Sequence, residues 1–137
     1  MPALDQCHPQ VVRALEKEGW TVLPVPHALL TPINYLFIDI EAHRLIDGDE
    51  QIIIIVEVKC FYDEKRVMED LYNAIGQYLV YRNLLKREAN EAELYLAVPT
   101  VAYYGIFQVL ALPLINDLAV KIMLVDLEKE EIEQWIS

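Results

Sequence analysis

The sequence predicts an α/β fold in which a mixed β-sheet is flanked by helices. The stretch "IIIIVEVK" at residues 52–59 consists mostly of β-branched apolar residues, which is typical of a strand buried on both faces. Residues 64–88 repeat apolar residues at helical spacing and form the longest such pattern in the chain. Strand-like segments lie on both sides of this helix, and a shorter helical pattern precedes them. The predicted order is therefore helix, three strands, helix and strand, with extra strands at the carboxyl-terminal end.

The amino-terminal half is predicted to form one helix followed by an antiparallel meander. Gly19 ends the helix, and prolines end the short strand that follows it. The turn residues "IDGDEQ" around Gly48 connect the last two strands of this half. In chain order, the predicted segments are a helix over residues 5–18, a short strand over 20–25, a loop with an apolar surface over 26–34, a strand over 35–45 and the central strand over 52–61.

The carboxyl-terminal half is predicted to complete the sheet. A helical crossover after the meander places the next strand parallel to the strand that it adjoins, so the sheet is mixed. In chain order, the predicted segments are a helix over residues 64–88, a strand over 92–99, an apolar piece over 100–117 forming a short helix and a loop, and strands over 119–126 and 131–136 with the acidic turn "LEKE" between them.

Length and composition predict a single domain over residues 1–137. No apolar run reaches the roughly 18 residues that a membrane-spanning helix needs. The amino-terminal sequence "MPALDQCHPQ" has no signal-peptide pattern, so we expect a cytoplasmic protein without a membrane partner. The two cysteines, Cys7 and Cys60, match no metal-binding spacing, and in that compartment we expect no disulfide between them.

The charge balance argues against an extended DNA-binding surface. The chain has 11 basic and 22 acidic residues, a net charge of -11. Nucleic-acid-binding proteins usually present a basic face, because release of cations from phosphates drives their affinity. Five basic residues lie along the second predicted helix, where they either form a small positive strip or balance neighbouring glutamates: Lys65, Arg66, Arg82, Lys86 and Arg87.

Three charged residues of the meander are candidates for a catalytic site. Glu57 and Lys59 project from the same face of the central strand, because side chains alternate along a strand. A symmetric hairpin around Gly48 places Asp39 directly opposite Glu57. Like charges in that position are destabilising, and a bound Mg²⁺ or Mn²⁺ would offset this repulsion. Lys59 would then orient or deprotonate a water for attack on phosphorus.

A purely structural interpretation of the same residues stays open. Charged residues often mark the point where a strand leaves the core and reaches solvent, and charge clusters are often structural. On the following helix, Gln77 and Tyr81 belong to one polar stripe that either faces the carboxylates or faces solvent. Gly76 favours the first alternative, because a glycine inside a helix is costly and indicates close approach of the backbone to the sheet or a ligand.

An acidic residue on one strand, E-x-K on the next and Q-x-x-x-Y on a helix resemble the PD-(D/E)xK nuclease superfamily. That superfamily has a restriction-endonuclease-like core with the order αβββαβ, which is the order predicted here. The resemblance implies that Asp39, Glu57 and the backbone carbonyl of Val58 are metal ligands. It implies that Lys59 is the catalytic lysine. It assigns auxiliary catalytic roles to Gln77 and Tyr81.

Longer segments are similar to the XisH family, the bacterial fdxN-element excision controlling factors. They are "VEVKCF", "AIGQYLVYRNLL", "LYLAVP" and "DLEKEEIEQWI", and they span most of the chain. This resemblance implies a DNA-rearrangement factor that controls excision of a chromosomal element during cell differentiation. It also implies a small protein partner, XisI. Two departures are His8, where related resolvase-type nucleases carry a glutamate, and Cys60, where a serine is expected.

Two functions follow from these resemblances. The first is a Mg²⁺-dependent DNA endonuclease. The second is a non-catalytic subunit with a nuclease-like fold that acts through an XisI-like partner or as a homo-oligomer, with a two-fold dimer as the expected form. The apolar segment 103–115 favours the second function if it is exposed, because such patches commonly mark interfaces. The alternative is that this segment packs on its own sheet.

Overall fold

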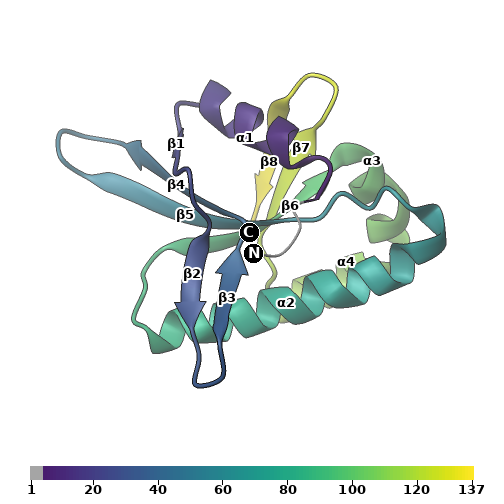
Figure 1. The fold of residues 1–137 in the computed structure, drawn as a ribbon. Helices are drawn as coiled ribbons and strands as arrows, with labels where there is room; N and C mark the ends of the chain where they lie inside the picture. Colours follow the sequence, from purple (N-terminus) through teal and green to yellow (C-terminus); the bar gives the residue numbers. More distant parts are fainter. Residues whose placement is uncertain (1–4) are drawn as a thin grey trace.

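The computed structural model describes residues 5–137, apart from the side chains of Ile106 and Leu110. Figure 1 shows a central sheet with helices on both sides. The elements are α1 (His8–Lys17), β1 (Thr21–Val22), β2 (His27–Leu30), β3 (Tyr35–Ile38), β4 (Ile40–Leu45), β5 (Gln51–Val58), η1 (Glu64–Arg66), α2 (Val67–Arg87), β6 (Glu93–Pro99), α3 (Thr100–Ala102), η2 (Tyr103–Ala111), α4 (Leu112–Leu118), β7 (Ile122–Asp126) and β8 (Glu131–Ile136).

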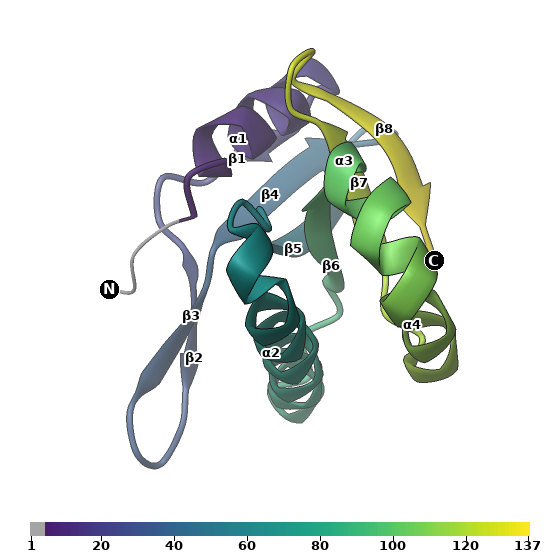
Figure 2. The same ribbon diagram turned by 90° about the vertical axis from the view of Figure 1, so that its right-hand side faces the viewer.

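The main sheet is mixed, as the sequence predicts. Its six strands follow the order β1-β4-β5-β6-β7-β8. The pairs β1–β4, β4–β5 and β7–β8 are antiparallel, whereas β5–β6 and β6–β7 are parallel. Helix α2 connects the first parallel pair, and the helical segment α3–η2–α4 connects the second. In Figure 2 the sheet is strongly twisted, and β8 forms its carboxyl-terminal edge.

The two faces of the sheet carry separate hydrophobic cores. On the α1 face, Val11, Ala14 and Leu15 of α1 share one core with buried residues of β5, β6 and β7. Their helical spacing produces the apolar side of α1, and Pro9 lies in the first turn, where it costs no backbone hydrogen bond. On the α2 face, buried residues of α2, η2 and α4 cover the opposite side of the same strands. The sheet is therefore covered on both sides at its centre.

The register of the β4–β5 hairpin is the one that the sequence predicts. Ile40 pairs with Val56 and Leu45 with Gln51, so the strands are symmetric about Gly48. Gly48 has a φ of 59°, a backbone conformation that glycine adopts readily. The predicted strand over 35–45 is interrupted at Asp39, which lies between β3 and β4 in a bend. This bend removes Asp39 from regular pairing and leaves its side chain next to the end of β5.

The prediction of a loop over residues 26–34 is wrong in part, because this segment contains strand β2. Strand β2 pairs with β3 in a separate two-stranded sheet that projects beside α2 (Figures 1 and 2). His27 anchors this hairpin, since its Nδ1 and Nε2 lie 2.7 Å from Glu41 and 3.1 Å from Glu88, on β4 and just after α2. Prolines on both sides of β2 made the segment look irregular, but its partner strand follows directly in the chain.

The apolar segment after β6 is helical throughout and not a short helix with a loop. Tyr103, Phe107 and Ile115 point toward the sheet and are buried in the α2-face core. Val101 and Val109 are exposed by 85% and 78%, so the opposite side of the segment faces solvent. One side of the segment therefore packs on its own sheet, as one alternative predicts, and the other side is exposed.

Within residues 5–137, no single helix has the length and apolar composition needed to cross a membrane. The segments Thr100–Val109 and Leu112–Leu118 meet that composition together, but they are bent relative to each other by 89°. Part of the central strand is less buried than expected. Residues Ile52 and Ile53 are exposed, because the β4–β5 hairpin extends beyond the helices that cover the sheet.

The expectation that the two cysteines stay unlinked is wrong. Cys7 and Cys60 form a disulfide, with their Cα atoms 5.8 Å apart. That separation lies within the usual range for such bonds. Cys60 points to the α1 face of the sheet, and the chain brings Cys7 to the same place just before α1 begins. The pairing joins residues 53 positions apart, so no local sequence pattern reveals it.

Candidate functional site

A small pocket lies where β5 leaves the sheet, on the side that α2 covers. Its volume is about 90 Å³. All the residues predicted for the site line this one pocket, so the structure brings them together. The lining residues are Asp39, Glu57, Val58, Lys59, Gln77 and Tyr81, together with Asp5 and Phe37. We call it the carboxylate pocket.

Two reciprocal hydrogen bonds hold the carboxylates next to each other. The backbone N–H of Val58 donates to Oδ2 of Asp39 at 2.8 Å. The backbone N–H of Asp39 donates to Oε1 of Glu57 at 3.3 Å. These bonds replace the regular strand pairing that the bend at Asp39 interrupts. As a result, the backbone of each strand end fixes the side chain of the other.

Both carboxyl groups lie in surroundings that disfavour their charge. Glu57 is the one buried charged residue within the described part of the chain, with 5% exposure. Burial and the neighbouring charge of Asp39 raise the pKa of Glu57 to about 8. Burial also raises the pKa of Asp39, although the hydrogen bond from Val58 opposes this shift. Without a cation, Glu57 is therefore protonated near neutral pH, whereas a cation would favour its ionised form.

Lys59 provides the positive charge of the pocket. It lies on the same side of β5 as Glu57, and its charge opposes the rise in the pKa of Glu57. Its backbone N–H donates to the carbonyl of Ala97 at 3.0 Å, which continues the pairing with β6. None of the ion pairs among residues 5–137 includes Lys59. Its amine is thus not tied to a partner away from the pocket.

Helix α2 supplies two polar side chains to the same pocket. Tyr81 is mostly buried, and its hydroxyl donates to the carbonyl of Phe37 at 3.5 Å. Burial and the charges of Glu57 and Asp39 raise the pKa of Tyr81 to about 12, so it stays a hydrogen-bond donor. The Oε1 atom of Gln77 is buried and has no hydrogen-bond partner among the described residues. This oxygen is available to a ligand in the pocket.

The interpretation of Gly76 as a point of close approach is wrong. A Cβ atom built at Gly76 has no neighbouring heavy atom within 4 Å. Gly76 lies on the exposed side of α2, while its neighbour Gln77 faces the pocket. Gln77 and Tyr81 do line the pocket, although Gly76 gives no evidence for this orientation of the helix.

The donor atoms of the pocket are compatible with a hard divalent cation. Mg²⁺ typically binds one or two carboxylates and completes its coordination with water and phosphate oxygens. Asp39 and Glu57 offer such oxygens, and the buried oxygen of Gln77 adds another acceptor. Residues 5–137 contain no group of three His, Cys, Asp or Glu side chains arranged as a metal site. A cation here would therefore depend on water or substrate oxygens.

Two residues near the pocket were not assigned from the sequence. Asp5 lines the pocket, and its Oδ2 accepts a hydrogen bond from the backbone N–H of Cys60 at 3.0 Å. His8 lines a neighbouring cavity together with Asp39, and its charge counteracts the rise in the pKa of Asp39 that burial causes. Asp5 lies outside any strand or helix, so no periodic pattern could have revealed its position.

The fold and the pocket together define a mixed α/β protein, and this fold is consistent with a nuclease-like architecture. A sequence model of the family described as XisH protein matches residues 1–133. The chain therefore belongs to the XisH family. No curated protein sequence matches it.

Two solved structures resemble the chain over nearly its whole length. An XisH family protein from Nostoc punctiforme has a TM-score of 0.84 and 36% sequence identity, covering 97% of this chain and 100% of its own. An fdxN element excision controlling factor protein from Anabaena variabilis has a TM-score of 0.83 and 33% identity, covering 95% of this chain and 97% of its own. The resemblance to the XisH family that the sequence segments predict is thus confirmed.

Proposed function

We propose that this XisH protein acts in excision of a DNA element as an endonuclease that depends on Mg²⁺ or Mn²⁺. The observation that carries this proposal is the convergence of Asp39, Glu57 and Lys59 in one pocket. The element-excision role is taken from the Anabaena variabilis relative, whose description names that process. Placing the buried carboxylate of Glu57 next to that of Asp39 is costly unless their charge is compensated, and a bound cation would compensate it.

The side chains of the pocket have different roles in the proposed phosphodiester hydrolysis. A bound divalent cation would polarise the scissile phosphate and lower the pKa of a water molecule. Asp39 and Glu57 hold that cation through carboxylate oxygens, and the carbonyl of Val58 is the third proposed ligand. Lys59 orients the attacking water or accepts its proton. Gln77 and Tyr81 contact the phosphate or the water from α2.

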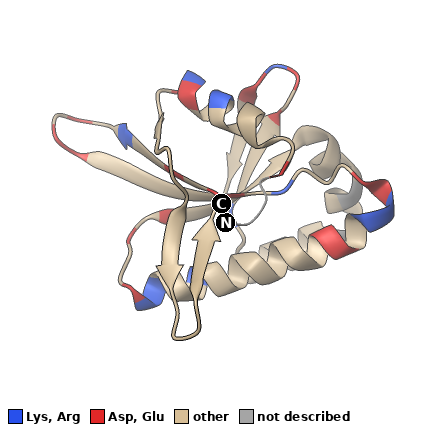
Figure 3. Ribbon diagram, viewed as in Figure 1, with Lys and Arg blue, Asp and Glu red and all other residues tan. Residues whose placement is uncertain are grey.

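The distribution of charge limits how DNA could be contacted. Basic residues lie near the two ends of α2 and not along its middle (Figure 3). Arg66 pairs with Glu69, and Arg82 donates to the carbonyl of Leu118 at 2.7 Å. These cations therefore support the protein's own structure. DNA binding by this chain would depend on the cation and Lys59, and would be weak without a partner.

A cleavage assay tests the proposal directly. The purified chain is incubated with branched and linear DNA in Mg²⁺ or Mn²⁺, with EDTA as the metal-free control. We expect cation-dependent cleavage that Lys59→Ala reduces by at least about 100-fold, the usual contribution of a general base. Lys65→Ala is the matched control, because Lys65 is an exposed lysine outside the pocket. Equal activity of wild type and Lys59→Ala would contradict the catalytic role of Lys59.

A second candidate function is a non-catalytic subunit of an excision complex. It is favoured by apolar side chains that remain exposed on the helical segment after β6, namely Val101, Tyr104, Val109 and Leu114. Exposed apolar patches of this kind mark sites of protein association. An XisI-like protein or a second copy of the chain is the proposed partner. Val101→Glu together with Val109→Glu would then abolish complex formation in size-exclusion chromatography, while the purified chain cleaves no DNA.

A further inference from the structure

The amino-terminal segment is fastened to the end of β5 by a covalent bond and a hydrogen bond. Cys7 precedes α1, Cys60 directly follows Lys59, and the two form a disulfide. The backbone N–H of Cys60 also donates to Oδ2 of Asp5 at 3.0 Å. Both contacts hold the chain around residue 5 beside the strand end that carries Lys59.

The position of Asp5 depends strongly on this disulfide. Apart from the hydrogen bond from Cys60, its nearest backbone bond runs within the same segment, from His8 N–H to the carbonyl of Asp5 at 3.0 Å. Cys7 donates its own N–H to the sulfur of Cys60, so this contact also depends on where the two cysteines lie. Chain ends that are not tied down are usually poorly ordered. Without the disulfide, Asp5 would leave the pocket for much of the time.

Asp5 adds a third negative charge to the wall of the carboxylate pocket. Burial is the main cause of the raised pKa of Asp39, and the charge of Asp5 raises it further. The two carboxyl groups are thus close enough to repel each other. The same charge attracts a cation, and a unit charge about 8 Å from a divalent cation contributes about 1 kcal/mol in water, or about fivefold in affinity.

We propose that the Cys7–Cys60 disulfide is a redox-sensitive tie that keeps Asp5 at the carboxylate pocket, so that its reduction weakens binding of a divalent cation there. This inference rests on the proposed function, since the cation is the one that Asp39 and Glu57 would hold. In the oxidised chain, the charge of Asp5 attracts the cation. Its hydrogen bond from the backbone N–H of Cys60 also holds the strand end next to Lys59.

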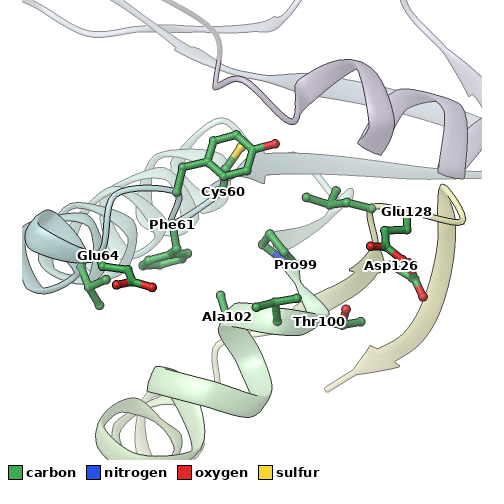
Figure 4. A pocket seen from close by; sticks show the side chains of 12 residues that line it. Cys60, Phe61, Glu64, Pro99, Thr100, Ala102, Asp126 and Glu128 are labelled. Carbon is green, nitrogen blue, oxygen red and sulfur yellow. The ribbon is translucent and has the colours of Figure 1, made fainter.

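A larger cavity provides the route for a reductant. It measures about 560 Å³ and lies beyond the carboxyl ends of β6 and β7, with Cys60 in its wall (Figure 4). Cys7 has no exposed surface, so a thiolate reaches the sulfur of Cys60 first and Cys7 is the leaving thiolate. Three carboxylates around the cavity disfavour an anionic thiol and favour a neutral or cationic dithiol: Glu64, Asp126 and Glu128.

The reduction is a two-step thiol–disulfide exchange. The first thiolate of the dithiol attacks Cys60, which breaks the bond to Cys7 and forms a mixed disulfide. The second thiol of the reductant then displaces Cys60. Two electrons and two protons pass to the protein and give two thiols, while the reductant becomes a disulfide.

Calorimetric titration with Mn²⁺ tests the inference on the intact chain. The oxidised chain is compared with chain reduced by dithiothreitol, desalted without oxygen and checked for its fold by circular dichroism. We expect about fivefold weaker Mn²⁺ binding after reduction, and the same loss in a Cys7→Ser, Cys60→Ser variant. Asp5→Asn gives a second test with the disulfide intact and should also weaken binding about fivefold. Asp47→Asn, in the exposed β4–β5 turn, is the matched control and should leave affinity unchanged.

The outcomes separate this inference from the proposed function. Equal Mn²⁺ affinity in the oxidised and reduced chains overturns the redox tie but leaves the cation site intact. Failure of Asp5→Asn to weaken binding overturns the role of Asp5. Absence of saturable binding in both redox states overturns the cation site, and the inference falls with it. Alkylation followed by mass spectrometry must also find Cys7 and Cys60 linked in the oxidised chain, and free thiols there would overturn the tie.

Discussion

Strand β5 presents two different faces to the helices on its two sides. On the α1 face, Ile54, Val56 and Val58 are buried among apolar side chains. On the α2 face, Ile55 is buried in the same manner, but Glu57 follows it and is nearly as inaccessible to solvent. One strand thus combines ordinary core packing on one side with a buried ionisable residue on the other.

The difference between these faces separates stability from function. Burial of apolar side chains accounts for the α1 face without further explanation. The α2 face contains groups whose burial opposes folding, since the pKa of Glu57 is raised to about 8. Features that break the local rules of folding are concentrated at functional sites. Substitutions on the two faces should therefore have effects of opposite sign.

The largest expected effect is a gain in stability from Glu57→Gln in the metal-free chain. The raised pKa means that the wild type is stabilised below about pH 4.5 and loses that stability as the pH rises to about 8. At pH 8.5 the free energy of unfolding of the variant should exceed that of the wild type by on the order of 4 kcal/mol. At pH 4 the two should be nearly equal. Urea denaturation in EDTA at both pH values measures this, and a constant difference would contradict it.

On the opposite face, Ile54→Ala should destabilise the protein by about 3 kcal/mol at every pH. It removes a buried side chain that is 2% exposed and leaves a cavity below α1. The same urea denaturation measures this loss, and cation binding should stay unchanged. A loss below about 1 kcal/mol would show that the α1 face is loosely packed.

Gly76→Ala should stabilise the chain by about 1 kcal/mol. Alanine is favoured over glycine inside a helix, and a Cβ atom at this position meets no neighbour within 4 Å. The midpoint temperature of thermal unfolding should rise accordingly, and DNA cleavage should not change. Destabilisation would contradict the open surroundings of Gly76.

The smallest expected effect on stability is that of Tyr81→Phe, below about 0.5 kcal/mol. The hydroxyl makes one long hydrogen bond of 3.5 Å to Phe37, which contributes little. If the hydroxyl donates a hydrogen bond to the phosphate, its loss should nevertheless slow cleavage by about tenfold. Loss of stability without loss of cleavage would assign Tyr81 to the core alone.

Much of the fold follows from short-range patterns in the sequence. The symmetric turn at Gly48 gave the β4–β5 register, and that register brings Asp39 close to Glu57. Helical spacing correctly placed Gln77 and Tyr81 on one side of α2. In each case, neighbouring residues carry the information. The mixed order of strands likewise follows from a helical crossover between β5 and β6.

The remaining features depend on contacts between distant segments. Strand β2 was missed because prolines surround it and its pairing, not its composition, makes it a strand. The helical path of residues 100–118 was missed because Pro113 looks like a break, although it lies in the first turn of α4. The disulfide and the position of Asp5 arise only when α1 packs across the end of β5.

Calorimetric titration of Mn²⁺ into the wild type, Asp39→Asn and Glu57→Gln at pH 7 tests the central claim most directly. The claim is that a buried carboxylate, Glu57, and a partly buried one, Asp39, from adjoining strand ends hold one divalent cation. It predicts one saturable site in the wild type and loss of that site in both variants, each of which remains folded by circular dichroism. No saturable binding to the wild type, or unchanged binding in both variants, would contradict it.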